Sequence, residues 1–286
     1  SHTNALGSDT FNDSAVFAGG TVLGSVFADF ASGAQVGNDA VDVTGTAISG
    51  GVDLGDGDNT FSMTAGSVGA NVESGSGVDE FRVSGGTIAG AINSGAGEDI
   101  LKLTGGAIGA GATTGQGADS VEIDGSAITG SVDTGTEADT ITLSSGSVSA
   151  SILAGTGDDG FTWSGGSLGA GFEGGDGSDT ATVSSSSYTG AQLLDGGDDV
   201  ATGDGFTDTL NLNGLTVTAN GGNLLNWELL NLNSTALTLD DSAITVGTLN
   251  VNNGSTLASS GALSVTGNVA TATGGSWLAP AGGSVS

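Results

Sequence analysis

The sequence predicts an all-β protein, a parallel β-helix with about 20 residues in each coil, and general chirality favours the right-handed form. Three observations carry this prediction. Between residues 41 and 200 one pattern returns every 20 residues, so that GSGVDEFRV at 75–83 returns as GAGEDILKL at 95–103. Within each block apolar and polar residues alternate, which is typical of a strand. The 56 glycines penalise helices throughout the chain.

Each 20-residue block has four apolar positions, which define the predicted core. Counted from the first apolar residue, they are positions one, three, eight and twelve. In the block 81–100 they are Phe81, Val83, Ile88 and Ile92. The last block breaks the rule at position twelve with Gln192. Position ten is always Gly or Ala, and its parity predicts a small inward side chain that leaves room for the larger ones.

A single block cannot fold alone. Burying four apolar side chains does not offset the conformational entropy lost when twenty residues become ordered. Stacked blocks supply both the missing hydrogen-bond ladders and further burial, with parallel strands about 4.8 Å apart. The repeat therefore predicts a solenoid in which equivalent side chains lie above one another.

The pattern divides the chain into three regions of one continuous elongated domain. Residues 1–40 read as irregular N-terminal coils, with an insertion at 27–40, and SHTN at the start reads as a cloning remnant before a fragment of a longer protein. Residues 41–200 are the regular coils. Residues 201–286 are richer in Leu and Asn and read as less regular C-terminal coils, with Trp227 as a core or cap aromatic.

A glycine–aspartate loop, G-x-G-x-D, occupies positions fifteen, seventeen and nineteen, with Glu137 as the one departure from the second glycine. Glycine permits the positive φ of a tight turn. Position nineteen has inward parity and holds Asn59 followed by seven aspartates: Asp79, Asp99, Asp119, Asp139, Asp159, Asp179 and Asp199. Carboxylates about 4.8 Å apart repel by roughly 1 kcal/mol in water and more when buried. This repulsion has to be offset.

Two interpretations of the aspartates stay open. In the first, which we favour, each carboxylate accepts N–H groups of its own glycine turn. In the second, calcium ions lie between successive turns, because hard oxygen ligands suit Ca²⁺. The loop partly resembles the RTX repeat G-G-x-G-x-D-x-U-x, whose family folds as a calcium-bound parallel β-roll. That family has the motif at both turns of its coil, whereas here one turn in 20 residues has it.

Two segments together resemble autotransporter passenger domains, the β-helical surface proteins of type V secretion in Gram-negative bacteria. They are coils such as GAGEDILKLTGGAIGA at 95–110, and the later GGNLLNWELLNLN at 221–233 followed by the Leu- and Asn-rich stretch 244–269. The resemblance implies a right-handed β-helix, a role in adhesion and virulence, and location at the cell surface or secretion. It also implies an autochaperone-like C-terminal segment from about residue 205. Membrane association would come only through a C-terminal β-barrel that is absent from this chain.

Charge narrows the range of partners. The formal net charge is −30, with Arg82 and Lys102 as the two basic residues. This field repels nucleic acids and anionic lipid surfaces. The chain contains no cysteine, which excludes disulfides and cysteine zinc sites. The remaining partners are a host-cell or matrix surface ligand, or another copy of the chain.

These observations predict a non-enzymatic stalk or adhesin, with a calcium-binding module and a β-helical polysaccharide-active enzyme as alternatives. Lyases acting on acidic sugars need cationic groups, but Arg82 and Lys102 lie at an outward position, where we expect a surface pair between Lys102 and Glu122. His2 is the one histidine and falls in the N-terminal remnant. We therefore assign no catalytic residue and no cofactor, with calcium held by the seven aspartates as the open possibility.

Overall fold

The chain folds as a parallel β-solenoid. In the computed structural model the described residues are 4–5, 12–28, 37–198, 200, 205–240, 244–252, 254–260, 263–271 and 274–278. They divide between two compact units, Ser1–Ala150 (the N-terminal unit) and Ser151–Ser286 (the C-terminal unit). Strands pair in parallel within each unit. In the part of the chain that the structure describes, no helix has the length and apolar character needed to cross a membrane.

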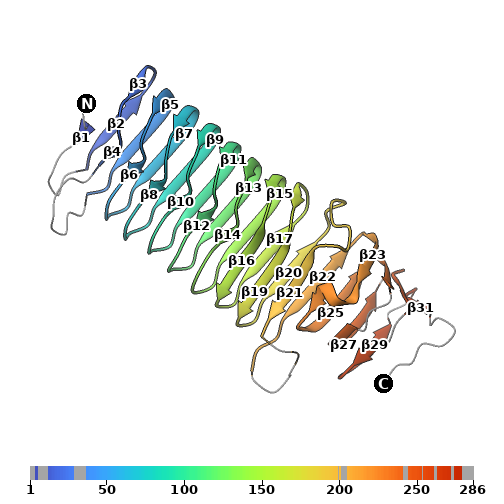
Figure 1. Ribbon diagram of the computed structural model, residues 1–286. Coiled ribbons are helices and arrows are strands. Elements are labelled where there is room, and N and C mark those ends of the chain that lie inside the picture. Colours follow the sequence, from blue (N-terminus) through green and yellow to red (C-terminus); the bar gives the residue numbers. More distant parts are fainter. Residues whose placement is uncertain are drawn as a thin grey trace. The chain divides into compact units, whose positions relative to one another are not determined.

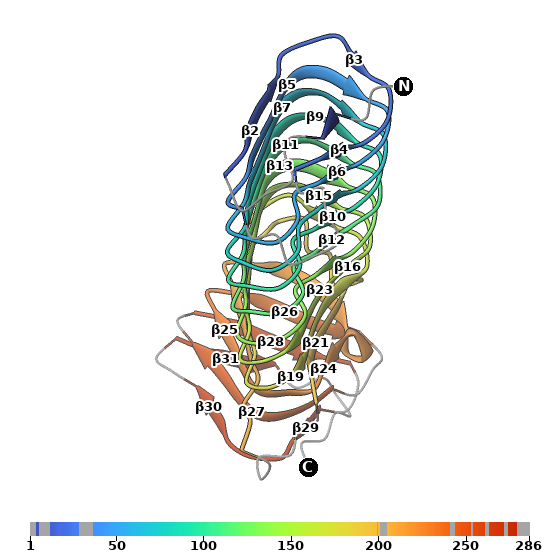
Figure 2. The same ribbon diagram turned by 90° about the vertical axis from the view of Figure 1, so that its left-hand side faces the viewer.

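Each regular coil of the N-terminal unit contributes one strand to each of two sheets (Figure 1). The short strands form a sheet in the order β1 (Asn4–Ala5), β4 (Val26–Phe27), β6 (Val52–Asp53), β8 (Val72–Glu73), β10 (Ile92–Asn93), β12 (Ala112–Thr113) and β14 (Val132–Asp133). The other sheet contains β2 (Ser14–Phe17), β3 (Thr21–Val22), β5 (Ala40–Ile48), β7 (Thr60–Val68), β9 (Glu80–Ile88), β11 (Ile100–Ile108), β13 (Ser120–Ile128) and β15 (Thr140–Val148). The coils of the N-terminal unit lie over one another in the view turned by 90° (Figure 2).

The 20-residue register is confirmed in this unit. Phe81 is paired with Phe61 on one side and Leu101 on the other, and Leu101 is paired in turn with Val121. The rings of Phe61 and Phe81 lie with their centroids 6.2 Å apart. These four side chains are 0–1% exposed, so equivalent residues of successive blocks form a continuous buried column.

Positions one, three, eight and twelve point inward as predicted, but the prediction for position ten was wrong. Ala70 and Ala110 are exposed, because the backbone turns between the long and the short strand of each coil at this point. Alternation describes a strand and does not extend through a bend. Small residues are required here by neighbouring turns: a Cβ added to Gly90 would lie 2.6 Å from the carbonyl carbon of Ala70.

The C-terminal unit has three sheets and one short 3₁₀ turn, η1 (Gly221–Asn223). One sheet contains β16 (Ser151–Thr156), β19 (Gly171–Asp176), β21 (Leu193–Gly197) and β24 (Leu224–Leu225). A second contains β17 (Gly160–Trp163), β18 (Ser167–Leu168), β20 (Thr180–Val183), β22 (Thr209–Asn213), β25 (Trp227–Asn233), β27 (Ile244–Asn252), β29 (Leu263–Val265) and β30 (Val269–Thr271). The third, which sequence analysis did not anticipate, contains β23 (Thr216–Asn220), β26 (Ala236–Asp240), β28 (Thr256–Ser259) and β31 (Ser276–Leu278).

The regular register ends earlier than residue 200. Phe172 of β19 is paired with Leu194 of β21, 22 residues later, so Leu194 rather than Gln192 occupies inward position twelve. Gln192 is displaced into the preceding turn, where its Oε1 accepts from the backbone N–H of Thr189 at 3.1 Å. Two extra residues in the turn therefore restore an apolar side chain to the core.

Asparagine ladders explain why the C-terminal coils are rich in this residue. The side-chain amide of Asn231 donates to Asn211 at 2.9 Å, and that of Asn250 donates to Asn231 at 2.8 Å. A second ladder runs beside it through the half-buried side chains of Asn213, Asn233 and Asn252. Trp227 is a core aromatic, as predicted, and its Nε1 donates to the carbonyl of Leu194 at 2.9 Å.

Replacing Tyr188 by phenylalanine should stabilise the protein. The Tyr188 ring packs edge-on against Trp163 at 5.9 Å, but its buried hydroxyl has no hydrogen-bond partner among the described residues. Because a buried unsatisfied hydroxyl costs free energy, Tyr188→Phe should raise the free energy of unfolding by about 1 kcal/mol. Thermal melting should show an increase of about 2–4 °C. Tyr188→Leu, which also removes the ring contact, is the control and should melt below Tyr188→Phe; a lower midpoint for the phenylalanine variant would contradict the assignment.

Candidate functional site

The most unusual feature of the interior is a ladder of acidic side chains at position nineteen, where the glycine turn leads into the long strand of each coil. In the N-terminal unit it consists of Asp39, Asn59, Asp79, Asp99, Asp119 and Asp139, and in the C-terminal unit of Asp159, Asp179, Asp208 and Glu228. All ten residues are between 0 and 4% exposed. The inward direction predicted from parity is therefore confirmed for every described member.

Within each unit, acidic side chains of the ladder bridge successive coils. The backbone N–H of Asp79 donates to Oδ1 of Asp99 at 2.8 Å, and the N–H of Asp99 donates to Oδ1 of Asp119 at 2.7 Å. The expectation that a carboxylate caps its own glycine turn was wrong, because the donor belongs to the equivalent residue of the neighbouring coil. The ladder therefore ties successive coils together through the core.

The ladder continues beyond the regular repeat of the C-terminal unit. The predicted member Asp199 lies outside the described residues, and Asp208 follows Asp179 in the ladder. The N–H of Asp179 donates to Oδ1 of Asp208 at 2.7 Å, and the N–H of Asp208 donates to Oε2 of Glu228 at 2.6 Å. Sequence analysis missed both residues, although each stands two positions before the first leucine of an alternating pair, as Asp79 stands before Phe81.

Burial dominates the electrostatics of the ladder. It raises the pKa of Asp79 and of Asp119 to about 6, from an ordinary value of 3.8, against the lowering effect of their hydrogen-bond donors. In the C-terminal unit burial raises the pKa of Asp179 to about 7 and that of Asp208 to about 8. Neighbouring carboxylates contribute to these raised pKa values after burial, since like charges disfavour ionisation.

The residue at position fourteen accounts for the higher aspartate pKa values in the C-terminal unit. In the four coils from 61 to 140 it is a serine or threonine, and the hydroxyls of Ser74 and Thr114 lower the pKa of Asp79 and Asp119. The position is Gly174 in the coil of Asp179, and a Cβ added to Gly196 would lie 2.7 Å from Oδ2 of Asp208. Glycine has no hydroxyl that could lower the pKa of the aspartate, so the rise in pKa caused by burial is larger.

The aspartates lie in a single file along the stack rather than around a common point. Among the described residues, no group of three or more His, Cys, Asp or Glu side chains is placed to hold a metal ion. Calcium in proteins takes about 6–8 oxygen ligands, and one oxygen of Asp79, Asp99, Asp119 and Asp179 already accepts a backbone N–H. We therefore assign no metal ligand here, and calcium binding by these residues and by Asp139 and Asp159 stays a prediction.

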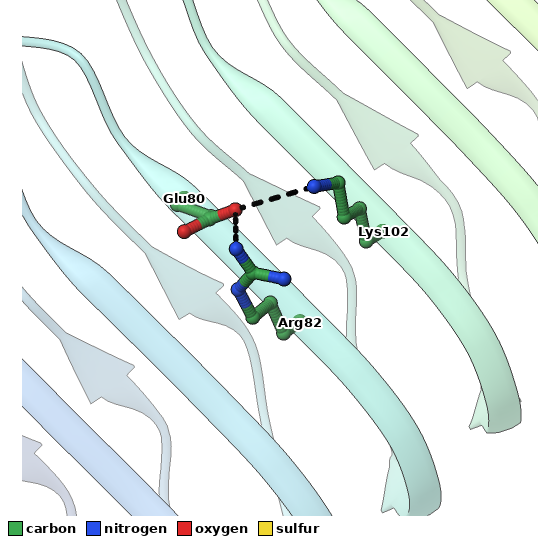
Figure 3. Close-up of polar contacts among 3 residues, drawn as sticks. All are labelled: Glu80, Arg82 and Lys102. Atoms are coloured by element: carbon green, nitrogen blue, oxygen red, sulfur yellow. Dashed lines mark ion pairs between the residues drawn. The ribbon is translucent and has the colours of Figure 1, made fainter.

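The two basic side chains converge on one carboxylate of the outer surface (Figure 3). Glu80 forms an ion pair with Arg82, and Lys102 Nζ lies 3.7 Å from Oε1 of Glu80. The expected pairing of Lys102 with Glu122 was wrong: their backbones are paired across β11 and β13, but the lysine side chain reaches back to the preceding coil. Such exposed pairs contribute about 0–1 kcal/mol. The remaining basic candidate, His2, lies outside the described residues.

A shallow groove of about 280 Å³ lies over the short strands β4, β6 and β8. Its polar lining includes Asp53, Glu73 and Asn71, and the Asn71 amide donates to Glu73 Oε1 at 2.8 Å. Partial burial and the nearby carboxylates of Glu73 and Asp56 raise the pKa of Asp53. The groove is therefore acidic, and its polar groups already bond to one another.

No protein-family model matches the chain, and no curated protein matches it. The chain is similar to a β-helical protein of known structure. That structure is an X-ray crystal structure of a hyperactive, Ca²⁺-dependent, β-helical antifreeze protein from an Antarctic bacterium. It is 19% identical, with 99% of this chain and 81% of that chain covered and a TM-score of 0.49. No argument about activity follows from a likeness at this level.

Proposed function

We propose that this chain is a non-enzymatic, surface-exposed or secreted β-helical segment of an autotransporter passenger, which serves as a stalk or as an adhesin. The observation that carries the proposal is the repetition itself. Each regular coil directs its four apolar residues inward and presents mainly Ser, Thr, Asn, Gly and acidic residues outward. A catalytic site is singular, whereas the outer surface here repeats from coil to coil.

The outer surface supports weak multivalent binding rather than one strong site. The large exposed apolar residues are scattered, with Val78 at 49% and Phe206 at 45% exposure, and no exposed aromatic cluster is available as a binding anchor among the described residues. Repeated polar side chains at the coil spacing suit a host-cell or matrix ligand that is itself repetitive, or a second copy of the chain. The net charge of −30 disfavours polyanionic partners.

Deletion of one whole coil tests this proposal. Removing residues 81–100 joins Glu80 to Leu101 and preserves both the inward pattern and the strand register. We expect the shortened chain to fold, with binding to cultured host cells or to immobilised matrix reduced by less than about twofold, because the remaining equivalent coils still contribute. Circular dichroism and a cell-binding assay provide the two measurements.

A matched control removes residues 81–90, half of a coil, which destroys the register and should prevent cooperative folding. Equivalent deletions of residues 61–80 and 101–120 should behave like the deletion of 81–100. Complete loss of binding on removing one particular coil, with folding intact, would point to a singular site and contradict the proposal. Turnover of a polysaccharide by the full chain would contradict its non-enzymatic part.

A further inference from the structure

We propose that the buried aspartates of the ladder are carried as neutral carboxylic acids, each donating its Oδ2 proton to a neighbouring backbone carbonyl, so that the solenoid is stabilised by acid and loosened by alkali. The residues that carry this proposal are Asp79, Asp99, Asp119, Asp179 and Asp208. The inference is independent of the proposed adhesive function.

Asn59 shows what the inner side of the ladder requires. Its Oδ1 accepts the N–H of Asp39 at 2.8 Å, the same contact between coils that the aspartates make. Its Nδ2 donates to the carbonyls of Gly57 at 2.9 Å and Gly55 at 3.2 Å. The second oxygen of each aspartate takes the place of this amide nitrogen. A donor is therefore needed there, and a carboxyl group supplies one only when protonated.

No other described donor satisfies these second oxygens. Oδ2 of the five aspartates is buried and accepts no hydrogen bond. The hydroxyls of Ser74 and Thr114 lie close enough to lower the pKa of Asp79 and Asp119, but neither forms a hydrogen bond to Oδ2. Each donates to a carbonyl instead: Ser74 Oγ to that of Gly55 at 3.3 Å, and Thr114 Oγ1 to that of Thr134 at 2.9 Å. An ionised oxygen at this place would be buried without a donor and would face carbonyl oxygens, which is strongly unfavourable.

The charged groups around the ladder also favour neutral aspartates, because the charged side chains that shift the pKa of these aspartates are themselves carboxylates. In the N-terminal unit, Asp79 has Asp99 as its acidic neighbour, and Asp119 has Asp99, Glu137 and Asp139. In the C-terminal unit, the acidic neighbours of Asp179 are Asp158, Asp159, Asp198 and Asp208. Those of Asp208 are Asp179, Asp198 and Glu228. Asp99 faces Asp79 and Asp119. The two cations, Arg82 and Lys102, are paired with Glu80 on the outer surface. No basic side chain among the described residues therefore neutralises the ladder, whereas protonation of the carboxylates does.

The direction of the pH effect follows from linkage. A carboxyl group whose pKa is higher in the folded chain than in the unfolded chain takes up a proton on folding at pH values between the two. Its contribution to stability is complete below about pH 4, the unfolded pKa. In the N-terminal unit this contribution is lost as the pH rises toward about 6. In the C-terminal unit it is lost as the pH rises toward about 7 or 8.

The test compares melting of the full chain across pH. We expect the melting midpoint of the wild-type chain to fall by roughly 10 °C between about pH 5 and about pH 9. The triple variant Asp79→Asn, Asp99→Asn and Asp119→Asn places amides where Asn59 already has one. It should melt above the wild-type chain at about pH 9 and show a shallower pH dependence.

A surface variant controls for the loss of negative charge. Glu98→Gln, Glu122→Gln and Asp124→Asn remove three exposed acidic groups from the same unit and should leave the pH dependence unchanged. Infrared spectra of the wild-type chain near neutral pH should contain a protonated-carboxyl band that is absent after unfolding. This measurement does not depend on whether the triple variant folds.

Two results would overturn the proposal. One is a wild-type infrared spectrum without that band below about pH 6, since the carboxyl groups would then be ionised in the fold. The other is a melting midpoint that rises in millimolar calcium relative to chelator in the wild-type chain and not in the triple asparagine variant. That outcome would show ionised aspartates acting as calcium ligands.

Discussion

Gly97→Ala should lower the free energy of unfolding by about 3–5 kcal/mol, one of the two largest effects we expect from a single substitution. Gly97 is the second glycine of its turn and has a φ of +142°, which L side chains rarely adopt. A Cβ added there would lie 2.6 Å from the Gly77 carbonyl carbon and closer still to its oxygen. Because this neighbour is backbone of the adjacent coil, it cannot move aside without opening the ladder.

Chemical denaturation of the two chains measures this effect, and Gly214→Ala is the matched control. Gly214 also has a positive φ, +68°, but nothing lies within 4 Å of the added Cβ. Its substitution should cost about 1–2 kcal/mol, from backbone strain alone. Equal effects of the two substitutions would show that the close stacking of turns is unimportant.

Glu137 shows how one coil tolerates a side chain at the position of the second glycine. Its φ is 72°, in contrast to the +142° of Gly97. Its carboxylate accepts the backbone N–H of Gly117 at 2.9 Å and the hydroxyl of Thr136 at 2.5 Å. These two bonds lower the pKa of Glu137 and offset part of the strain. An alanine at position 97 has no such side-chain acceptor.

Phe81→Ala should also lower the free energy of unfolding by about 3–5 kcal/mol, the usual range for a buried phenylalanine. The side chain is 0% exposed and lies in the column between Phe61 and Leu101. Its removal would leave a cavity that neighbouring coils cannot fill, since their spacing is set by backbone hydrogen bonds. Urea denaturation followed by tryptophan fluorescence or circular dichroism measures the loss.

Arg82→Ala provides the control for Phe81→Ala within the same strand. Arg82 is the next residue, points outward and takes part in an exposed ion pair with Glu80. Its removal should change the free energy of unfolding by no more than about 1 kcal/mol. If the two variants were equally stable, position one would not belong to the core, and the inward pattern of the solenoid would be contradicted.

Much of the fold could be predicted because each repeat of the sequence corresponds to one coil of the solenoid. In the block 81–100 the alternation of Phe81 and Val83 with polar residues identified the inward face, and the 20-residue interval identified Leu101 as the partner of Phe81. The same parity placed Asp99 inside. These inferences held because strand geometry relates neighbouring residues by a simple rule.

Prediction failed where the chain leaves a strand or the repeat is interrupted. Position ten lies in a bend, so Ala70 is exposed despite its inward parity. Leu194 rather than Gln192 is paired with Phe172, and Asp208 rather than a residue 20 positions later accepts from Asp179, because the interval between coils is not constant here, whereas counting along the pattern assumes that it is.

The sequence by itself determined the solenoid, its period and the burial of an acid in the coils from 61 to 180. Only the tertiary structure decided what each acid bonds to: Oδ1 of Asp99 accepts the N–H of Asp79, in the neighbouring coil. It also decided that Asn59 donates to glycine carbonyls on the inner side of the ladder. The physical reason is that alternation along a strand shows only whether a side chain points inward. The hydrogen-bond donor that this side chain meets belongs to the neighbouring coil, about 20 residues away in the sequence.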